Sequence, residues 1–182
     1  MKILVINGSP RKEARNKGVA DLAKEILRNK GIEVLSFDVR EQELPVFRAE
    51  GEQFALPNVQ DLQAVFHEAD GFFVATPEYH NAISGALKNM FDFVNAELVK
   101  DKPLAMAVGS GGGKGGINAL NNLRLVGRGL YANVLPSQLI IDPYAFNENM
   151  QVVDEEVKLQ VEKLVDELLL YALHYENTLK NK

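Results

Sequence analysis

KILVINGSPRKEARNKG, residues 2–18, joins a short apolar run to a polar loop that is rich in positive charge. The run at residues 2–6 is what a strand buried on both faces of a parallel sheet requires. Apolar residues then recur at helical spacing, at Val19, Leu22, Ala23, Ile26 and Leu27. Gly31 follows as a helix stop signal. The stretch therefore predicts a strand, a loop and a helix in succession, the first unit of an α/β fold.

The same alternation continues along the chain. Four further apolar runs are typical of strands, at residues 33–39, 71–77, 103–110 and 133–141. Helical periodicity occupies the segments 59–66, 82–96, 117–132 and 157–172. Residues 40–57, with two prolines and mixed charge, are expected to form a long connection. The pattern predicts a three-layer α/β/α sandwich around a five-stranded parallel sheet, in the flavodoxin-like order 2-1-3-4-5 or in a Rossmann-type order.

Composition excludes several classes of function. A length of 182 residues favours a single domain over residues 1–182. The absence of cysteine excludes disulfides, thiolate metal sites and cysteine nucleophiles. A net charge of −5 argues against a nucleic-acid partner. Because the sequence contains neither a long apolar stretch nor a secretory signal, we expect a cytoplasmic protein with no membrane association.

The predicted sheet indicates where function lies. Parallel α/β sheets bind ligands beyond the carboxyl ends of their strands, near the point where the strand order reverses. The loops that follow the first, third and fourth predicted strands are therefore the candidate site. They span residues 7–18, 76–85 and 109–118.

The first of these loops predicts a phosphate site. A helix N-terminus supplies unpaired N–H groups and partial positive charge, and Gly8 permits a tight turn before it. Side chains that can bind phosphate oxygens follow, at Ser9, Arg11, Lys12, Arg15, Asn16 and Lys17. Asn16 is also a candidate N-cap. The loop lacks the Walker pattern, which favours a terminal monophosphate over a nucleoside triphosphate. A solvated polar loop is the alternative.

The third loop, GSGGGKGG at residues 109–116, contains six glycines. It formally matches the dinucleotide fingerprint at Gly111, Gly113 and Gly116, but the acidic residue expected about 20 positions later is missing. Glycines also let the backbone approach a flat ring and point N–H groups at it, and we favour this interpretation. A loop without a ligand remains the other alternative.

The middle loop, TPEYHNAISGALKN at residues 76–89, offers planar and polar side chains. Pro77 stiffens the exit from the strand, and Asn81 or Ser84 is expected to cap the next helix. Glu78 and His80 suggest a metal site or a general base. We expect no metal site, because the other two histidines belong to different predicted helices. The nucleophile elbow G-x-S-x-G of hydrolases is absent.

In this order, GSPR…N, PEYHNAISGALKN and GSGGGKGG resemble the NADPH-dependent FMN reductase family. The run GGGKGGINALNNLRLVGRGLYANVLPSQL is similar to its bacterial azobenzene reductase branch. The resemblance covers essentially the whole chain. It implies a flavodoxin-like fold, tightly bound FMN, and a homodimer or homotetramer. The apolar stripe of segment 82–96 is a candidate interface, and packing on its own sheet is the alternative.

Carried over by position, the resemblance implies three groups of cofactor-binding residues. Ser9, Arg11 and Asn16 would hold the FMN phosphate. The isoalloxazine ring would be wrapped by Pro77, Glu78, Tyr79, His80 and Asn81. Its other edge would be covered by Ser110, Gly111, Gly112 and Gly113. Many members carry serine or threonine where this chain has Ala14, and we expect Arg15 and Lys17 to compensate.

The implied activity is that of an FMN-dependent NAD(P)H oxidoreductase. NADPH or NADH would pass hydride to FMN, and an azo compound, a quinone or free flavin would accept it in a ping-pong cycle. Such a cycle requires no catalytic side chain, and backbone N–H groups of the glycine loop would stabilise developing negative charge. Candidates for binding the 2′-phosphate of NADPH are Arg15, Lys17 and Arg48. Two alternatives are an FMN-binding electron carrier or sensor with little NAD(P)H turnover, and a phosphate-binding module without redox activity.

Overall fold

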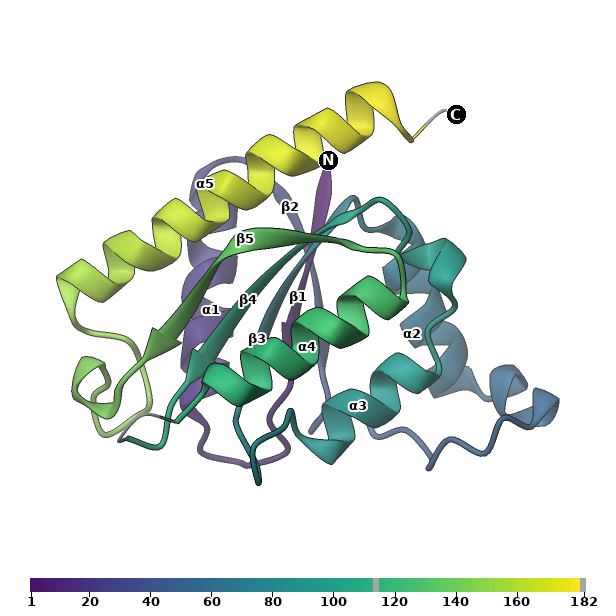
Figure 1. Ribbon diagram of the computed structural model, residues 1–182, viewed down its shortest axis with the longest axis horizontal. Helices are drawn as coiled ribbons and strands as arrows, with labels where there is room; N and C mark the ends of the chain where they lie inside the picture. Colours follow the sequence, from purple (N-terminus) through teal and green to yellow (C-terminus); the bar gives the residue numbers. More distant parts are fainter. Residues whose placement is uncertain (113–114, 181–182) are drawn as a thin grey trace.

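The computed structural model describes residues 1–112 and 115–180. Over these residues, five strands alternate with five α-helices, and the strands form one parallel sheet in the order β2-β1-β3-β4-β5 (Figure 1). The strands are β1 (Lys2–Asn7), β2 (Glu33–Asp38), β3 (Gly71–Thr76), β4 (Pro103–Gly109) and β5 (Asn133–Ile141). This confirms the predicted flavodoxin-like order and excludes the Rossmann-type alternative.

The helices cover both faces of the sheet. They are α1 (Arg15–Asn29), α2 (Pro57–Glu68), α3 (Gly85–Asp92), α4 (Ile117–Gly129) and α5 (Glu155–Thr178). Helices α1 and α5 pack on one face, and α2, α3 and α4 pack on the other (Figure 1). The side chains of β1 alternate between these layers, because successive residues of a strand point to opposite faces. Ile3 and Val5 face α1 and α5, whereas Leu4 and Ile6 face the other helices.

Helix α3 is shorter than the predicted segment 82–96. It begins after Ser84, whose Oγ accepts the N–H of Leu87 at 3.0 Å and donates to the carbonyl of Gly8 at 2.6 Å. Ser84, and not Asn81, is therefore the N-cap. The apolar stripe of this segment is buried on the chain's own sheet, at Ile83, Leu87, Met90, Phe91 and Val94.

The connection between β2 and α2 contains a short 3₁₀ helix, η1 (Gly51–Ala55). Phe47 and Phe54 pack edge-on against Phe93, with ring centroids 5.0 and 5.9 Å away. Asn89 of α3 accepts the N–H of Phe47 and donates to the carbonyl of Pro45, both at 2.9 Å. Two further 3₁₀ helices are η2 (Ala96–Leu98) and η3 (Pro143–Ala145).

Strand β5 lies at an edge of the sheet, which explains why it contains Pro136. Its pairing with β4 is irregular between Leu104 and Met106. Arg124 of α4 donates to the carbonyl of Leu135 at 2.8 Å and to Gln138 Oε1 at 2.9 Å. A bulge and a covering cation both protect an edge strand from pairing with another chain.

The segment Phe146–Val152 closes on itself through an antiparallel bridge and lies against the first turns of α1. Met150 adopts a left-handed conformation with φ of 61°. A Cβ atom on Gly18 would overlap the Met150 carbonyl, so only glycine lets the two segments approach this closely.

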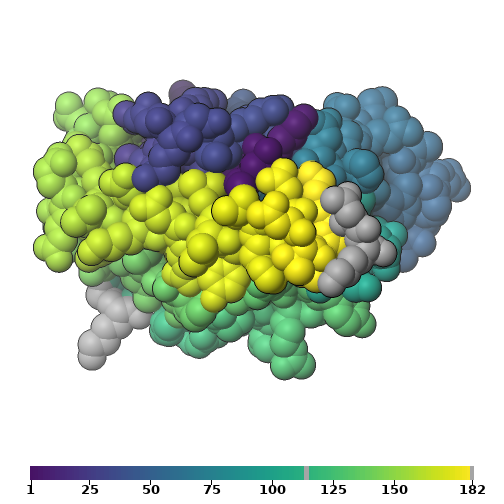
Figure 2. Space-filling view, turned by 90° about the horizontal axis from the view of Figure 1, so that it is seen from above, coloured from purple at the N-terminus to yellow at the C-terminus, as the bar shows by residue number. Residues whose placement is uncertain are grey.

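Charged side chains gather where the strands begin, and we call this region the amino edge. Asp70 is 2% exposed and accepts the N–H of Lys2 at 2.8 Å and the Nζ of Lys180 at 2.6 Å. The amino group of Met1 lies 3.6 Å from a carboxylate oxygen of Glu176. Figure 2 shows the start of the chain beside the last turns of α5, which these contacts hold in place.

Lys102 is the second buried charge of the amino edge. Its Nζ donates to the carbonyls of Phe66 at 3.0 Å and His67 at 3.4 Å, at the C-terminal end of α2. Burial lowers the pKa of Lys102 to about 8, although nearby Asp70 acts in the opposite direction.

No helix within residues 1–112 and 115–180 combines the length and apolar character needed to cross a membrane.

Candidate functional site

Three loops meet where β1, β3 and β4 end, and we call this region the carboxyl edge. These strands are neighbours in the sheet, so the loops that follow Asn7, Thr76 and Gly109 leave it side by side (Figure 1). The structure thus brings together the three segments that the sequence singled out. Their polar contacts determine what they can bind.

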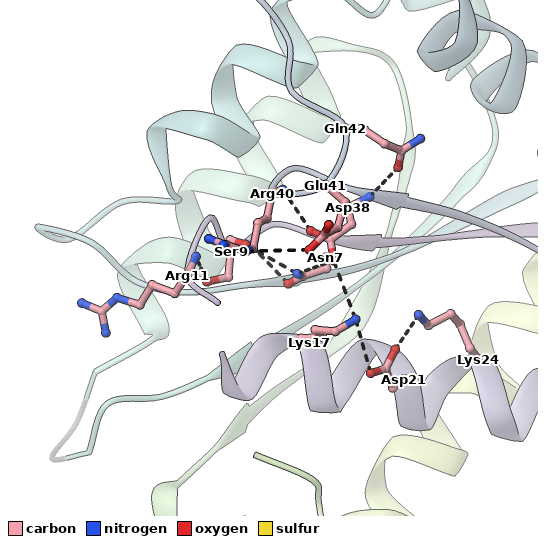
Figure 3. A network of polar contacts seen from close by, with 10 residues as sticks. All are labelled: Asn7, Ser9, Arg11, Lys17, Asp21, Lys24, Asp38, Arg40, Glu41 and Gln42. Atoms are coloured by element: carbon pink, nitrogen blue, oxygen red, sulfur yellow. Dashed lines mark hydrogen bonds and ion pairs between the residues drawn. The ribbon is translucent and has the colours of Figure 1, made fainter. Parts of the chain in front are cut away.

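The first loop is held by Asn7 (Figure 3). Its Oδ1 accepts the N–H of Ser9 at 3.2 Å, and its Nδ2 donates to Asp38 Oδ2 at 3.0 Å. Ser9 is buried, and its Oγ accepts the N–H of Arg11 at 3.4 Å. Gly8 packs closely against α3 and β3, since a Cβ there would lie 2.7 Å from Leu87 Cδ2 and 3.1 Å from the carbonyl of Ala75.

Helix α1 begins after Ala14, and the prediction that Asn16 is its N-cap is wrong. Asn16 is instead the second helical residue. Its Oδ1 accepts the N–H of Gly109 at 2.7 Å and its Nδ2 donates to the carbonyl of Gly109 at 3.5 Å, which fixes α1 to the end of β4. In the part of the chain that the structure describes, no side chain caps α1. Its first turn therefore keeps the partial positive charge that attracts an anion.

The two arginines of the first loop reach toward the other loops. The Arg11 guanidinium carbon lies 5.3 Å from the centre of the Tyr79 ring. Arg15 donates from Nη1 to the carbonyl of Ser110 at 3.3 Å, and its guanidinium carbon lies 5.9 Å from the centre of the Phe146 ring. Arg15 Nε is buried and has no hydrogen-bond partner among the described residues.

Lys17 points toward β2 instead. Its Nζ lies 3.7 Å from a carboxylate oxygen of Asp21 and 3.9 Å from one of Asp38 (Figure 3). Both pairs are at the long end of the range for ion pairs. Lys17 is thus close to the phosphate loop, but carboxylates partly offset its charge.

The middle loop is a tight hairpin. Tyr79 and Ala82 exchange backbone hydrogen bonds of 2.9 and 3.1 Å. The two residues between them, His80 and Asn81, have φ angles of 51° and 64° and are exposed. Positive φ at both central positions is the signature of a type I′ turn. The Tyr79 hydroxyl is buried, and within residues 1–112 and 115–180 it has no partner.

The middle loop is also bound to the start of α4. Glu78 Oε2 accepts the N–H of Ala119 at 2.9 Å. Asn118 donates from Nδ2 to Asn81 Oδ1 at 3.2 Å, and Asn122 Oδ1 accepts the N–H of Ile83 at 3.4 Å. These contacts were not predicted from the sequence.

The glycine loop is organised by Ser110. Its Oγ donates to Asp142 Oδ1 at 3.2 Å and accepts the N–H of Gly112 at 2.9 Å. Gly112 has a φ of 109°, a conformation that favours glycine. Gly113, which the sequence also assigned to this site, lies outside the described residues.

A groove of about 820 Å³ lies beside these loops, between α1 and residues 148–153. Its lining includes Ala14 and Lys17 but none of residues 76–85 or 109–112. Its lining contains three lysines and four carboxylates, a balance of charge that does not suit a phosphate. The groove therefore flanks the carboxyl edge rather than forming the site. Among the described residues, no group of three or more His, Asp or Glu side chains is arranged to hold a metal ion.

Comparison with known proteins assigns this arrangement to a family. The model of the NADPH-dependent FMN reductase family matches residues 1–146. The chain is 37% identical over 180 residues to an NADPH azoreductase of Bacillus sp. (strain OY1-2), covering 99% of this chain and 97% of the relative. The chain belongs to the NADPH-dependent FMN reductase family.

Other relatives agree with this assignment. The chain is 28% identical over 180 residues to an FMN-dependent NADPH-azoreductase of Staphylococcus aureus, covering 94% of this chain and 95% of that protein. The flavoenzyme NAD(P)H:(acceptor) oxidoreductase FerB from Paracoccus denitrificans has the same fold, with a TM-score of 0.77 at 20% identity and coverage of 95% and 97%. The protein is thus an oxidoreductase of a family that uses FMN and NADPH.

The carboxyl edge fits FMN in chemical terms. A monophosphate needs an uncapped helix N-terminus and charge-assisted donors, and α1 with Arg11 and Arg15 supplies both. A flat ring needs backbone that approaches without side chains, which the glycine loop offers. Arg15 Nε and the Tyr79 hydroxyl are polar atoms for which the described residues provide no partner, as expected beside a polar ligand.

Sequence reasoning missed the residues that join the loops. Asp142 and Phe146 contact predicted site residues but belong to no recognised motif, and Asn118, although it lies in the run that resembles the azobenzene reductase branch, was assigned no role. The one available signal was at α4, because its first turn follows Gly116 and contains no capping side chain. Such a helix start must find its acceptor elsewhere.

Proposed function

We propose that this member of the family passes hydride from NADPH, or from NADH, to an azo compound, a quinone or free flavin. The observation that carries the proposal is the meeting of an uncapped helix N-terminus, two arginines and a glycine loop at one edge of the sheet. Azo compounds are proposed as acceptors because the Bacillus relative is named an NADPH azoreductase. NADPH and acceptor would use the same open space in turn.

We propose that FMN is bound by the residues of the three loops. Ser9, Arg11 and the first-turn N–H groups of Arg15 and Asn16 would hold the phosphate, with Lys17 acting at longer range. The side chain of Asn16 is not free for this role, because it binds Gly109. The ring would be contacted by Pro77, Glu78, Tyr79, His80, Asn81, Ser110, Gly111, Gly112 and Gly113.

FMN, when bound, supplies the hydride-transfer chemistry. The chain binds its phosphate, orients its ring, and offers backbone N–H groups where negative charge develops. We assign no side chain an obligatory proton transfer, because hydride transfer in this cycle needs no acid or base from the protein.

Spectroscopy of the purified protein tests the proposal. We expect the protein to take up FMN and to show the flavin absorption bands. Anaerobic addition of NADPH should bleach these bands, and an azo dye or a quinone should restore them. FMN uptake without bleaching would instead indicate an electron carrier or a sensor. A colourless protein that takes up no FMN would contradict the proposal.

We further propose that residues 1–182 act as one domain, in the cytoplasm, within a homodimer or homotetramer. Exposed apolar side chains support self-association, among them Leu125, Tyr131 and Leu170. Light scattering at working concentration tests the assembly, and an active monomer would contradict it. Cell fractionation tests the location.

A further inference from the structure

The N-terminal cap of helix α4 is supplied by another part of the chain. Gly116, at its N-cap position, has a φ of 115° and no side chain to offer. The N–H of Ala119, the third helical residue, donates to Glu78 Oε2 at 2.9 Å. A capping side chain normally accepts this N–H from the N-cap position itself. Here a carboxylate does so from the loop that follows β3.

The same loop contacts α4 at two more points. Asn81 Oδ1 accepts from Asn118, and the N–H of Ile83 donates to Asn122 Oδ1. Glu78 is half-buried, whereas His80 and Asn81 at the hairpin tip are exposed. The Glu78–Ala119 contact is thus better shielded from water than the hairpin tip, as is the contact between Ile83 and Asn122. Its carboxylate also lies beside the glycine loop, since a Cβ on Gly115 would be 3.9 Å from Glu78 Oε1.

We propose that Glu78 is a positioning residue that holds the middle loop on α4 and lowers the reduction potential of bound FMN. This inference rests on the proposed function. A helix N-terminus carries a partial positive charge of about half a unit, which would stabilise negative charge on a reduced ring. The full negative charge of Glu78 more than offsets it. Glu78 therefore disfavours reduced FMN relative to oxidised FMN.

The consequence concerns the class of acceptor. A lower potential makes the two-electron transfer from reduced FMN to an acceptor more favourable, and the transfer from NADPH correspondingly less favourable. Acceptors that are hard to reduce benefit most from such tuning.

Three variants separate the hydrogen bond that Glu78 makes to Ala119 from the effect of its negative charge. Glu78→Gln keeps an oxygen that can accept the Ala119 N–H but removes the negative charge. Glu78→Ala removes both. The matched control is Glu97→Gln, which removes the same charge from an exposed residue of η2, before β4 begins. The midpoint potential of bound FMN is measured for each by equilibration with a redox dye.

We expect Glu78→Gln to shift the potential to a more positive value by about 10–30 mV, because a tenfold change in the ratio of dissociation constants for the two redox forms corresponds to about 30 mV for two electrons. A shift smaller than about 10 mV, a negative shift, or an equal shift in Glu97→Gln overturns the tuning role. A residue with only a structural role would leave the potential of Glu78→Gln unchanged.

The contact between Glu78 and the Ala119 N–H is tested in protein without FMN. In FMN-free protein, hydrogen exchange at the Ala119 amide should be several-fold faster in Glu78→Ala than in the wild type, and Glu78→Gln should restore most of the protection. Equal exchange rates in all three proteins would contradict the proposal that Glu78 holds the middle loop on α4. If the wild type takes up no FMN, the proposed function and the tuning role fail together, and the exchange experiment still decides whether Glu78 holds the loop.

Discussion

The two edges of the sheet differ in whether their buried polar groups have partners. At the amino edge, Asp70 and Lys102 are buried, and both bind partners from distant parts of the chain. At the carboxyl edge, α1 starts without a cap, and Arg15 Nε and the Tyr79 hydroxyl have no partner among the described residues. Partnered buried charge holds a fold together, whereas unpartnered polar groups are tolerated where a ligand satisfies them.

This contrast separates stability from binding. Substitutions at the amino edge should lower the free energy of unfolding and spare FMN affinity. Substitutions at the carboxyl edge should lower FMN affinity and leave the free energy of unfolding nearly unchanged.

The largest effect is expected at the amino edge. Asp70→Ala leaves the charge of Lys180 without its partner and the N–H of Lys2 without its acceptor. The free energy of unfolding in urea should fall by about 2–3 kcal/mol, because the N–H of Lys2 loses its acceptor and buried Lys102 loses a nearby negative charge, whereas the exposed Lys180 contributes little. Asp61→Ala, at an exposed position of α2, is the control. Equal stability of the two variants would remove the contrast between the edges.

At the carboxyl edge, Arg11→Ala should weaken FMN binding by about 10- to 100-fold, because a hydrogen bond to a charged group contributes about 1.5–3 kcal/mol. Riboflavin lacks the phosphate, so its affinity should change much less. Titration of both flavins by fluorescence quenching checks this, with Arg28→Ala in the last turn of α1 as control. An equal loss for riboflavin would assign Arg11 to the ring instead.

The pH dependence of the free energy of unfolding tests the burial of Lys102 at the amino edge. The pKa of Lys102 is lowered by burial from 10.5 to about 8. Between these values the unfolded chain binds more protons than the folded chain, so the contribution of Lys102 to the free energy of unfolding rises with pH. Below about pH 8 both states are protonated and this contribution is constant.

Comparison with Lys102→Met isolates the contribution of Lys102, since groups distant from it titrate alike in both proteins. The stability of the wild type relative to the variant should rise by about 1–2 kcal/mol between about pH 7.5 and 9.5. Urea denaturation at the two pH values measures it. A difference that stays constant would mean that Lys102 keeps an ordinary pKa.

The smallest effect is expected for His80→Ala. His80 is exposed at the hairpin tip, and the proposed cycle needs no acid or base there. NADPH oxidation should stay within about threefold of the wild type, far from the loss of about 10²-fold or more that removing a general acid or base causes. Steady-state assay of the FMN-loaded protein checks this. Complete loss of turnover with FMN still bound would reveal a catalytic group.

Much of the fold could be predicted because its signals are local. The central strands are buried on both faces, so β1, β3 and β4 are continuous apolar runs with ends within one residue of the prediction. The errors concern helix ends. Asn16 lies where an N-cap was plausible, but the end of β4 uses its side chain. The start of α3 depends on Ser84, whose second partner is Gly8, 76 residues away.

The candidate site was predicted loop by loop but not as a connected whole. Residue types in each loop indicated phosphate or ring binding, because that chemistry depends on short motifs. Which loop contacts which depends on tertiary packing. Glu78 and Ala119 are 41 residues apart, and Asn16 and Gly109 are 93 apart. No periodicity or motif links such pairs, so the coupling of the middle loop to α4 became visible only in the structure.

The contact between Gly18 and the Met150 carbonyl limits how this chain can vary. Surface connections usually accept insertions and deletions. The segment after β5 is an exception, because the carbonyl of Met150 must lie against Gly18, where α1 has no side chain. Length variants of residues 146–152 should therefore be rarer among functional sequences than variants of the connection after β2, and libraries that randomise Gly18 should return glycine almost alone.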